Sequence, residues 1–266
     1  MDDVLINQTK EVDDTRFKKL RIFNLLMAVL HAAQGGLMLY FSTNFSLPIT
    51  TLFVEFNSQS QKLEPVLKEI FSLSIGPLVA GFLFLFALAH LAVSLPSIYD
   101  WYVRNLKKGA NYARWIEYFF SSSLMIVVVA MLAGMSDGVS LMLLFFLNGM
   151  MILFGWIMEL HNQTTERTNW TSFIFGCLAG AIPWGAVALY LFFAGGETGR
   201  APTFVYWIFF SIFLFFNVFA VNMVLQYRKV GKWKDYLYGE RAYIILSIVA
   251  KSLLAWQVWA GTLRPV

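Results

Sequence analysis

The chain has 266 residues, of which 58% are hydrophobic and only 14% are charged, and its mean hydropathy is +0.63. A soluble domain is about 25% charged, so this composition excludes an ordinary soluble protein and indicates a polytopic membrane protein. The formal net charge of +4 gives no reason to expect a nucleic-acid partner, because the basic residues lie in separate loops. Cys177 is the single cysteine, so an intrachain disulfide is excluded.

Seven apolar segments follow a polar, acidic N-terminal stretch that is unlike a cleavable signal peptide. Each has about the 20 residues that a helix needs to cross a bilayer, and the mostly short connections favour antiparallel neighbours. We therefore predict an all-α membrane protein with a tail at 1–21 and one seven-helix membrane domain at 22–266. The expected spans are 22–41, 76–96, 112–133, 138–160, 171–194, 203–227 and 242–263.

The connection at 42–75 is much longer than the others. Its section SLPITTLFVEF has the β-branched and aromatic content of a strand. A loop of this length usually has structure or a function of its own. We predict a β-hairpin here.

The basic residues are distributed unequally between the two ends of these spans. Fifteen lie at the N-terminal flank and in the connections on that side, four lie on the opposite side, and Lys251 lies inside the last span. Cytoplasmic loops collect Lys and Arg. We therefore expect a multi-pass protein of the cell membrane with its N-terminus in the cytoplasm and its C-terminus outside.

Lys251 lies near the middle of the last span, AYIILSIVAKSLLAWQVWAGTL. A charge at this depth costs about 2.5–3.5 kcal/mol on insertion scales. The side chain therefore needs a partner, a covalent modification or a neutral state. A lysine in an apolar pocket can condense with an aldehyde to form a Schiff base.

Glu117, in the third span, is the acidic residue best placed to meet Lys251. Both helices run in the same direction, and Glu117 is nine residues from Lys108 while Lys251 is ten residues from Arg241. These separations correspond to roughly 13.5 and 15 Å of helix rise, so the two groups lie at similar depth. The same count places Arg114 inside the membrane boundary, one turn from Glu117. The alternative to a functional pair is a structural ion pair.

Two serines lie one helical turn from these groups, Ser247 before Lys251 and Ser121 after Glu117. Either hydroxyl can hydrogen-bond a protonated Schiff base or its counterion. The alternative is that each serine bonds to its own backbone or permits close helix packing.

Several blocks, in this order and spacing, resemble the heliorhodopsins. They are RWIEYFFSSSLMIV around Glu117, NGMMILFGW at 148–156, FGCLAGAIPW at 175–184, FLFFN at 213–217 and GERAYIILSIVAKSLLAWQVWAGTL at 239–263. The resemblance extends from the first span to the C-terminus. Heliorhodopsins are seven-helix retinal proteins whose N-terminus is cytoplasmic, opposite to other microbial rhodopsins, and the charge distribution predicts the same orientation.

The resemblance implies that Lys251 carries all-trans retinal as a Schiff base and that Glu117 is its sole carboxylate counterion. It implies neither a metal site nor an enzymatic activity. Residues expected to line the chromophore are Tyr118, Ser121, Met125, Asn148, Met151, Ile152, Trp184, Phe213, Phe216 and Ser247. A polar cavity on the cytoplasmic side is expected from His31, Gln34, His90, Asn111, Arg114, Glu159, Tyr236 and Glu240. From the residues alone, each histidine is more readily a satisfied interior residue than a proton carrier.

The sequence also departs from the expected pattern at Phe86, one turn before His90, where a serine is expected. This leaves one hydroxyl missing near the Schiff base. His161 and Glu197 lie in connections and are expected to be solvated.

Two carboxylates of an archaeal-type proton pump are missing. Their positions, one turn before the retinal lysine and about three turns beyond the counterion, hold Ser247 and Val128. Valine cannot return a proton, which favours slow reprotonation and a light sensor over a pump. The expected cycle takes retinal from all-trans to 13-cis, moves the proton toward His31 and His90, and acts on a signalling partner that the sequence does not identify. The alternatives are a light-gated proton channel and a retinal-free transporter that uses Lys251 and Glu117 for ion coupling.

Gly176 and Gly180 form a small-xxx-small pair on the fifth span, which permits close approach of two helices. Heliorhodopsins are similar in forming dimers, so a homodimer through the fourth and fifth spans is one interpretation. Packing within the chain is the other.

Overall fold

The seven predicted spans are confirmed. The computed structural model describes residues 2–193 and 201–264, with side chains from residue 14 onward. Seven of its helices are long and apolar enough to cross a membrane. They are α1 Asp2–Phe41, α2 Ile75–Ala92, α4 Tyr112–Leu132, α5 Gly138–His161, α6 Thr171–Phe193, α7 Thr203–Tyr227 and α8 Tyr236–Val258, which a π-helical turn, η2 Trp259–Leu263, continues.

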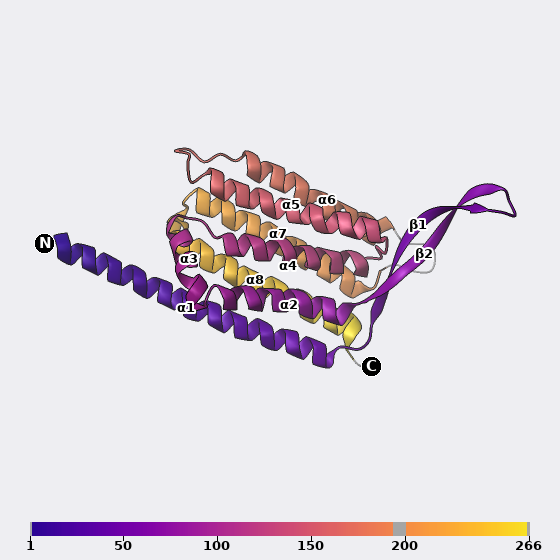
Figure 1. Cartoon of the computed structure of the whole chain (residues 1–266), viewed down its shortest axis with the longest axis horizontal. Coiled ribbons are helices and arrows are strands. Elements are labelled where there is room, and N and C mark those ends of the chain that lie inside the picture. The colour runs from indigo at the N-terminus through magenta and orange to yellow at the C-terminus, as the bar shows by residue number, and fades with distance from the viewer. Residues whose placement is uncertain (1, 194–200, 265–266) are drawn as a thin grey trace.

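The first helix begins much earlier than predicted. Residues 2–21, expected as a separate tail, continue α1 without interruption, and Figure 1 shows this part projecting beyond the bundle. No glycine or proline occurs before Gly35, so nothing in the sequence breaks the helix. The part that can span a membrane is Asp14–Phe41.

A short helix, α3 Pro96–Lys107, was not predicted. It starts with proline at its first turn, a position that suits proline, and this ends α2 at Ala92 rather than at residue 96. Tyr102 and Leu106 are buried, while Arg104 on the other face is exposed. In Figure 1, α3 lies across the ends of the spans rather than along them.

The predicted hairpin is confirmed and is formed by β1 Ser46–Asn57 and β2 Lys62–Ser74. Its antiparallel register pairs Leu52 with Leu67 and Asn57 with Lys62. The base of the hairpin is fixed to the start of α5, where the Thr50 backbone N–H donates to the Ser136 carbonyl at 2.8 Å. Figure 1 shows the rest projecting from the end of the bundle opposite to α3.

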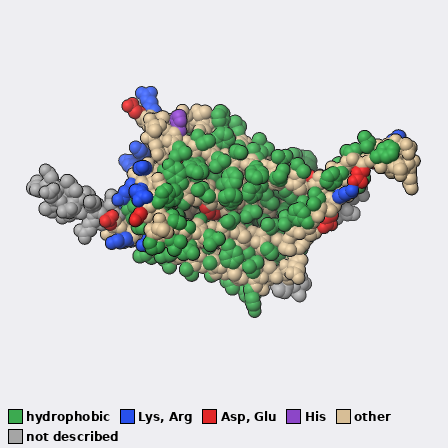
Figure 2. All heavy atoms as spheres, viewed as in Figure 1, with side chains coloured by type: hydrophobic (Ala, Val, Ile, Leu, Met, Phe, Trp, Pro, Cys, Tyr) green, Lys and Arg blue, Asp and Glu red, His purple; other side chains and the backbone are tan. Residues whose placement is uncertain are grey.

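The central helix of the bundle is α4. In its most apolar window 67% of the residues are buried, against 28% for α1 and α7. It packs against α2 and α5, while α8 packs against α7 and α1. Figure 2 shows an apolar lateral surface, with Lys and Arg gathered at the end where α3 lies. Ionisable groups on α4 therefore face protein rather than lipid.

Candidate functional site

Lys251 of α8 and Glu117 of α4 meet inside the bundle. The Lys251 Nζ donates to Glu117 Oε1 at 2.8 Å and to Ser247 Oγ, one turn earlier on α8, at 2.8 Å. Lys251 is only 3% exposed and Glu117 only 7%. Removing such charges from water costs several kcal/mol for each ion. The pair therefore depends on these direct partners.

The site also contains polar atoms without partners. Among the described residues, Glu117 Oε2 and the buried Ser121 Oγ make no hydrogen bond. Ser247 thus reaches the amine as the sequence suggested, whereas Ser121 does not. Buried polar atoms are rarely left unpaired, and one of these two belongs to the carboxylate that pairs with Lys251.

Aromatic rings cover the remaining side of the amine. The centroid of the Phe86 ring lies 3.7 Å from Lys251 Nζ, and that of Tyr118 lies 5.2 Å away. Phe86 occupies the position where a serine was expected. The face of an aromatic ring attracts a cation, so a ring takes the place of the missing hydroxyl.

A cavity of about 300 Å³ extends from Lys251 between α4, α5, α6 and α7. Most of the residues predicted to line a chromophore line this cavity: Tyr118, Ser121, Met125, Met151, Ile152, Trp184, Phe213, Phe216 and Ser247. Further lining residues that the sequence did not suggest include Trp115, Phe173, Phe219, Met223 and Tyr243. Phe219 and Met223 follow Phe216 at helical spacing, a signal that would have revealed them.

The structure does not bring Asn148 to this cavity. Its buried side chain donates to Ser122 Oγ at 2.9 Å and to Ser123 Oγ at 3.2 Å, and so it joins α5 to α4. Asn148 was predicted to line the chromophore from resemblance alone. The position of Asn148 along its helix does not predict that its side-chain amide turns toward the hydroxyls of Ser122 and Ser123.

Three glycines that line the cavity allow close contacts between side chains and neighbouring helices. A Cβ atom at Gly180 would lie 2.4 Å from Met151 Sδ, and one at Gly155 would lie 2.6 Å from the Trp115 ring. Gly176 likewise faces α5, where a Cβ would lie 3.3 Å from Phe154 Cβ. The Gly176–Gly180 pair therefore serves packing of α6 on α5 within the chain.

The cavity also reaches the lateral surface of the bundle, because exposed residues of α6 and α7, among them Cys177 and Asn217, line it.

A second buried cluster lies toward the end of the bundle where α3 is found. Arg114 forms ion pairs with Glu240 and, at 2.9 Å, with Glu159. Asn111 donates from its side chain to Glu240 at 2.7 Å and from its backbone to Glu159 at 2.9 Å. Tyr236 Oη also donates to Glu159, at 3.0 Å. The structure thus brings together five of the eight residues predicted for the polar cavity.

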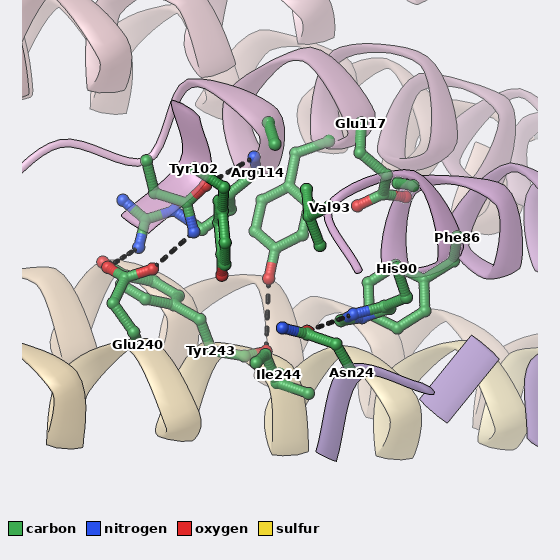
Figure 3. A pocket seen from close by; sticks show the side chains of 14 residues that line it. Asn24, Phe86, His90, Val93, Tyr102, Arg114, Glu117, Glu240, Tyr243 and Ile244 are labelled. Carbon is green, nitrogen blue, oxygen red and sulfur yellow. Dashed lines mark hydrogen bonds and ion pairs between the residues drawn. The ribbon is translucent and has the colours of Figure 1, made fainter. Parts of the chain in front are cut away.

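A small cavity of about 40 Å³ separates this cluster from Glu117 (Figure 3). A volume of this kind holds a few water molecules at about 10–15 Å³ each. Its walls include Asn24 of α1 and Tyr102 of α3, which the sequence did not suggest. Burial raises the pKa of the Tyr102 hydroxyl, which therefore stays protonated.

The two histidines predicted for this cavity differ in their partners. His90 Nδ1 lies 2.6 Å from Asn24 Oδ1, whereas neither ring nitrogen of His31 has a partner among the described residues. Gln34 lies apart from the cluster, because it accepts a hydrogen bond from Trp256 Nε1 at 3.1 Å, beyond Lys251 on α8. His161 is exposed at the end of α5, and Glu197 lies outside the described residues.

Comparisons with known proteins agree with this architecture. A model of the heliorhodopsin family matches residues 20–263, nearly the whole chain. Among solved structures, the chain is similar to the light-driven proton pump LR (Mac) from Leptosphaeria maculans, with 13% sequence identity, 92% of this chain and 95% of that chain covered, and a TM-score of 0.61. No curated protein sequence matches the chain. The predicted seven-helix rhodopsin fold is confirmed, and at this identity the solved structure supports the fold alone.

Proposed function

Because the chain belongs to the heliorhodopsin family, a family of membrane-embedded retinal photoreceptors, we propose that it is a light sensor that carries all-trans retinal on Lys251. The observation that carries the proposal is a buried amine at one end of an apolar cavity, paired with a single buried carboxylate. A pair inside a membrane span is expensive, and function is the default interpretation.

The residues present suit a flat, conjugated aldehyde. The cavity is at the lower limit of ligand pockets, about 300–1,000 Å³, and its walls are mainly aromatic, methionine and glycine residues. Trp184 packs edge to face with Phe209, Phe213 and Phe216, at centroid distances of 5.2–5.4 Å, which gives one wall a rigid aromatic surface. The lateral opening between α6 and α7 gives an apolar molecule a path from the bilayer.

Retinal bound to Lys251 as a Schiff base supplies the absorption of visible light and an isomerisation from all-trans to 13-cis. The protein's part is to hold a positive charge at the Lys251 nitrogen. Glu117 and Ser247, which accept hydrogen bonds from the free amine, would offer acceptors to the single N–H of a protonated Schiff base. If the nitrogen gave up its proton toward the polar side of the site, His31 and His90 would be the candidate acceptors. Movement of the aromatic walls then changes the surface that a signalling partner meets.

Sensing is favoured over pumping because two expected carboxylates are replaced. Ser247 occupies the position one turn before Lys251, and the buried Val128 occupies the position of a proton donor. A valine cannot return a proton, so recovery is slow. A light-gated proton channel on the same scaffold is the second candidate, since the small polar cavity beside Glu117 offers room for water.

Orientation and assembly belong to the same proposal. The basic end of the bundle (Figure 2) supports a cytoplasmic N-terminus in the cell membrane, because Lys and Arg collect on that side. A homodimer is proposed from the family alone, since Gly176 and Gly180 are occupied by packing against α5.

Flash photolysis of the purified protein supplied with all-trans retinal tests the function. We expect a visible band that bleaches and recovers slowly, and no steady photocurrent in voltage-clamped cells that express the protein. A visible pigment with a passive light-induced current favours the channel. Absence of any visible band rejects both and favours a retinal-free transporter.

A further inference from the structure

Phe86 of α2 contacts the amine of Lys251 and two buried histidines. Its ring centroid is 3.7 Å from Lys251 Nζ, 4.3 Å from the His31 ring and 4.1 Å from the His90 ring. Both histidine rings meet it edge to face, and Figure 3 shows Phe86 and His90 side by side next to Glu117. Phe86 itself is only 3% exposed.

The contacts of the amine are divided between oxygen and carbon. An ammonium group has three N–H donors, and two of them point to Glu117 and Ser247. The face of Phe86 covers another side, where it attracts the charge but accepts no proton. The ring therefore satisfies the cation without offering a route for proton transfer.

The two histidines that contact this ring have nitrogen atoms available. Within the described part of the chain, both nitrogens of His31 and the Nε2 of His90 lack hydrogen-bond partners. Neither imidazole bonds to Lys251 or to Glu117 there, and their one hydrogen-bond partner in that part of the chain is Asn24, on His90 Nδ1. Proton transfer needs groups within hydrogen-bond distance or joined through one water, and the Phe86 ring contacts both the amine and the two imidazoles.

We propose that Phe86 is a positioning residue that holds the charge of the Lys251 nitrogen against its face and keeps that nitrogen apart from His31 and His90. The part that concerns light rests on the proposed function. Phe86 directs the proton of the nitrogen to Glu117 in the dark and slows its exchange with the histidines after illumination. Phe86, which occupies the position of an expected serine, is thus a barrier to proton exchange between the Lys251 nitrogen and the histidines.

The barrier is tested first without retinal. Deuterium exchange at the imidazole C2 position, followed by mass spectrometry at fixed pH, reports access of water to each histidine. We expect slow exchange at His31 and His90 in the wild type, and an acceleration of about tenfold or more in Phe86→Ser, because a hydroxyl and water replace the ring. The exposed His161 is an internal control that should not change.

The matched control is Phe82→Ser, one turn earlier on α2. Phe82 is fully buried in an apolar core, and within the described part of the chain its ring makes no cation–π contact with Lys251 and no ring contact with either histidine. Phe82→Ser removes an aromatic ring, as Phe86→Ser does, but it does not open the space beside the Lys251 amine. Equal acceleration in both variants would mean general loosening of α2 and would overturn the proposal.

With retinal bound, a second variant separates the two roles. Phe86→Leu keeps an apolar barrier but removes the ring face, so the visible band should move while the rates of its loss and recovery after a flash stay within about threefold of wild type. Phe86→Ser should raise these rates by about tenfold or more. Phe82→Leu should leave both unchanged.

Unchanged histidine exchange and unchanged flash kinetics in Phe86→Ser would overturn the barrier, and an unmoved band in Phe86→Leu would overturn the charge contact. A wild type that forms no pigment would reject the proposed function, while the exchange measurement would still decide whether Phe86 separates the amine site from the histidines.

Discussion

Two buried ionic clusters share helices α4 and α8 but differ in the number of carboxylates that meet the cation. Arg114 on α4 meets Glu240 on α8 and Glu159 on α5, and these carboxylates also receive hydrogen bonds from Asn111 and Tyr236. Glu117, one turn further along α4, meets Lys251, and among the described residues its Oε2, like Arg114 Nε, has no hydrogen-bond partner. One cluster has two carboxylates for one cation, and the other has a single carboxylate.

From this difference we infer a structural role for the Arg114 cluster and a role in the response to light for the Lys251 cluster. A buried network in which one cation meets two carboxylates, and these accept further hydrogen bonds, is rigid and specifies one arrangement of the helices. A pair with an unpaired oxygen, beside a cavity and an aromatic ring, can change its contacts at a smaller cost. The arginine cluster is therefore expected to control stability, and the lysine cluster to control the response to light.

The largest expected change in stability comes from Arg114→Ala. Removing one member of a buried ion cluster leaves uncompensated charge and costs about 3–5 kcal/mol. Thermal or denaturant unfolding in detergent measures this loss. Arg104→Ala is the matched control, since Arg104 is exposed on α3 and should change stability by less than about 0.5 kcal/mol. Equal stabilities of the two variants would contradict a structural role for the cluster.

The two clusters should respond in opposite ways to the loss of a carboxylate charge. Glu117→Gln should shift the visible band strongly, because it removes the counter-charge next to the chromophore. Glu159→Gln should leave the band near its wild-type position and lower stability by about 1–3 kcal/mol, because its donors lose an ionised acceptor. Absorption spectra and unfolding curves of both variants decide between the assignments. A visible band that moves in Glu159→Gln but not in Glu117→Gln would contradict both assignments.

The smallest effect concerns the two buried serines near the amine. Ser247→Ala should cost about 1 kcal/mol in the retinal-free protein, since it removes an acceptor of the Lys251 ammonium. Ser121→Ala should cost less, because Ser121 Oγ has no partner among the described residues. Unfolding of both variants under the same conditions measures the difference. A larger loss in Ser121→Ala would show that the hydrogen bonding of the amine is assigned wrongly.

The sequence predicted depth along the helices better than direction around them. Lys251 was found as a charge within an apolar span, and Glu117 as the acid at equal depth; both follow from counting residues along an axis of fixed rise. Gln34 and Asn148 lie on predicted spans, but their side chains meet Trp256 and the α4 serines instead of the expected groups. Which way a polar side chain turns depends on neighbours from other helices, which periodicity does not reveal.

Helix α3 was missed for a related reason. Its 12 residues are too few to span a membrane and mix polar with aromatic side chains, so hydropathy gives no signal. Proline at its start and the Trp101 and Tyr102 pair were the available signs of a separate helix. The hairpin, by contrast, was predictable because its β-branched and aromatic composition is sustained over one whole strand.

The most direct test of the central assignment is the absorption spectrum of the protein expressed with all-trans retinal, recorded beside that of Lys251→Ala at equal concentration of folded protein. We predict a visible band in the wild type and none in the variant, because Lys251 is the amine at the end of the cavity. A wild type without colour, or a variant that keeps the same band, would contradict the assignment.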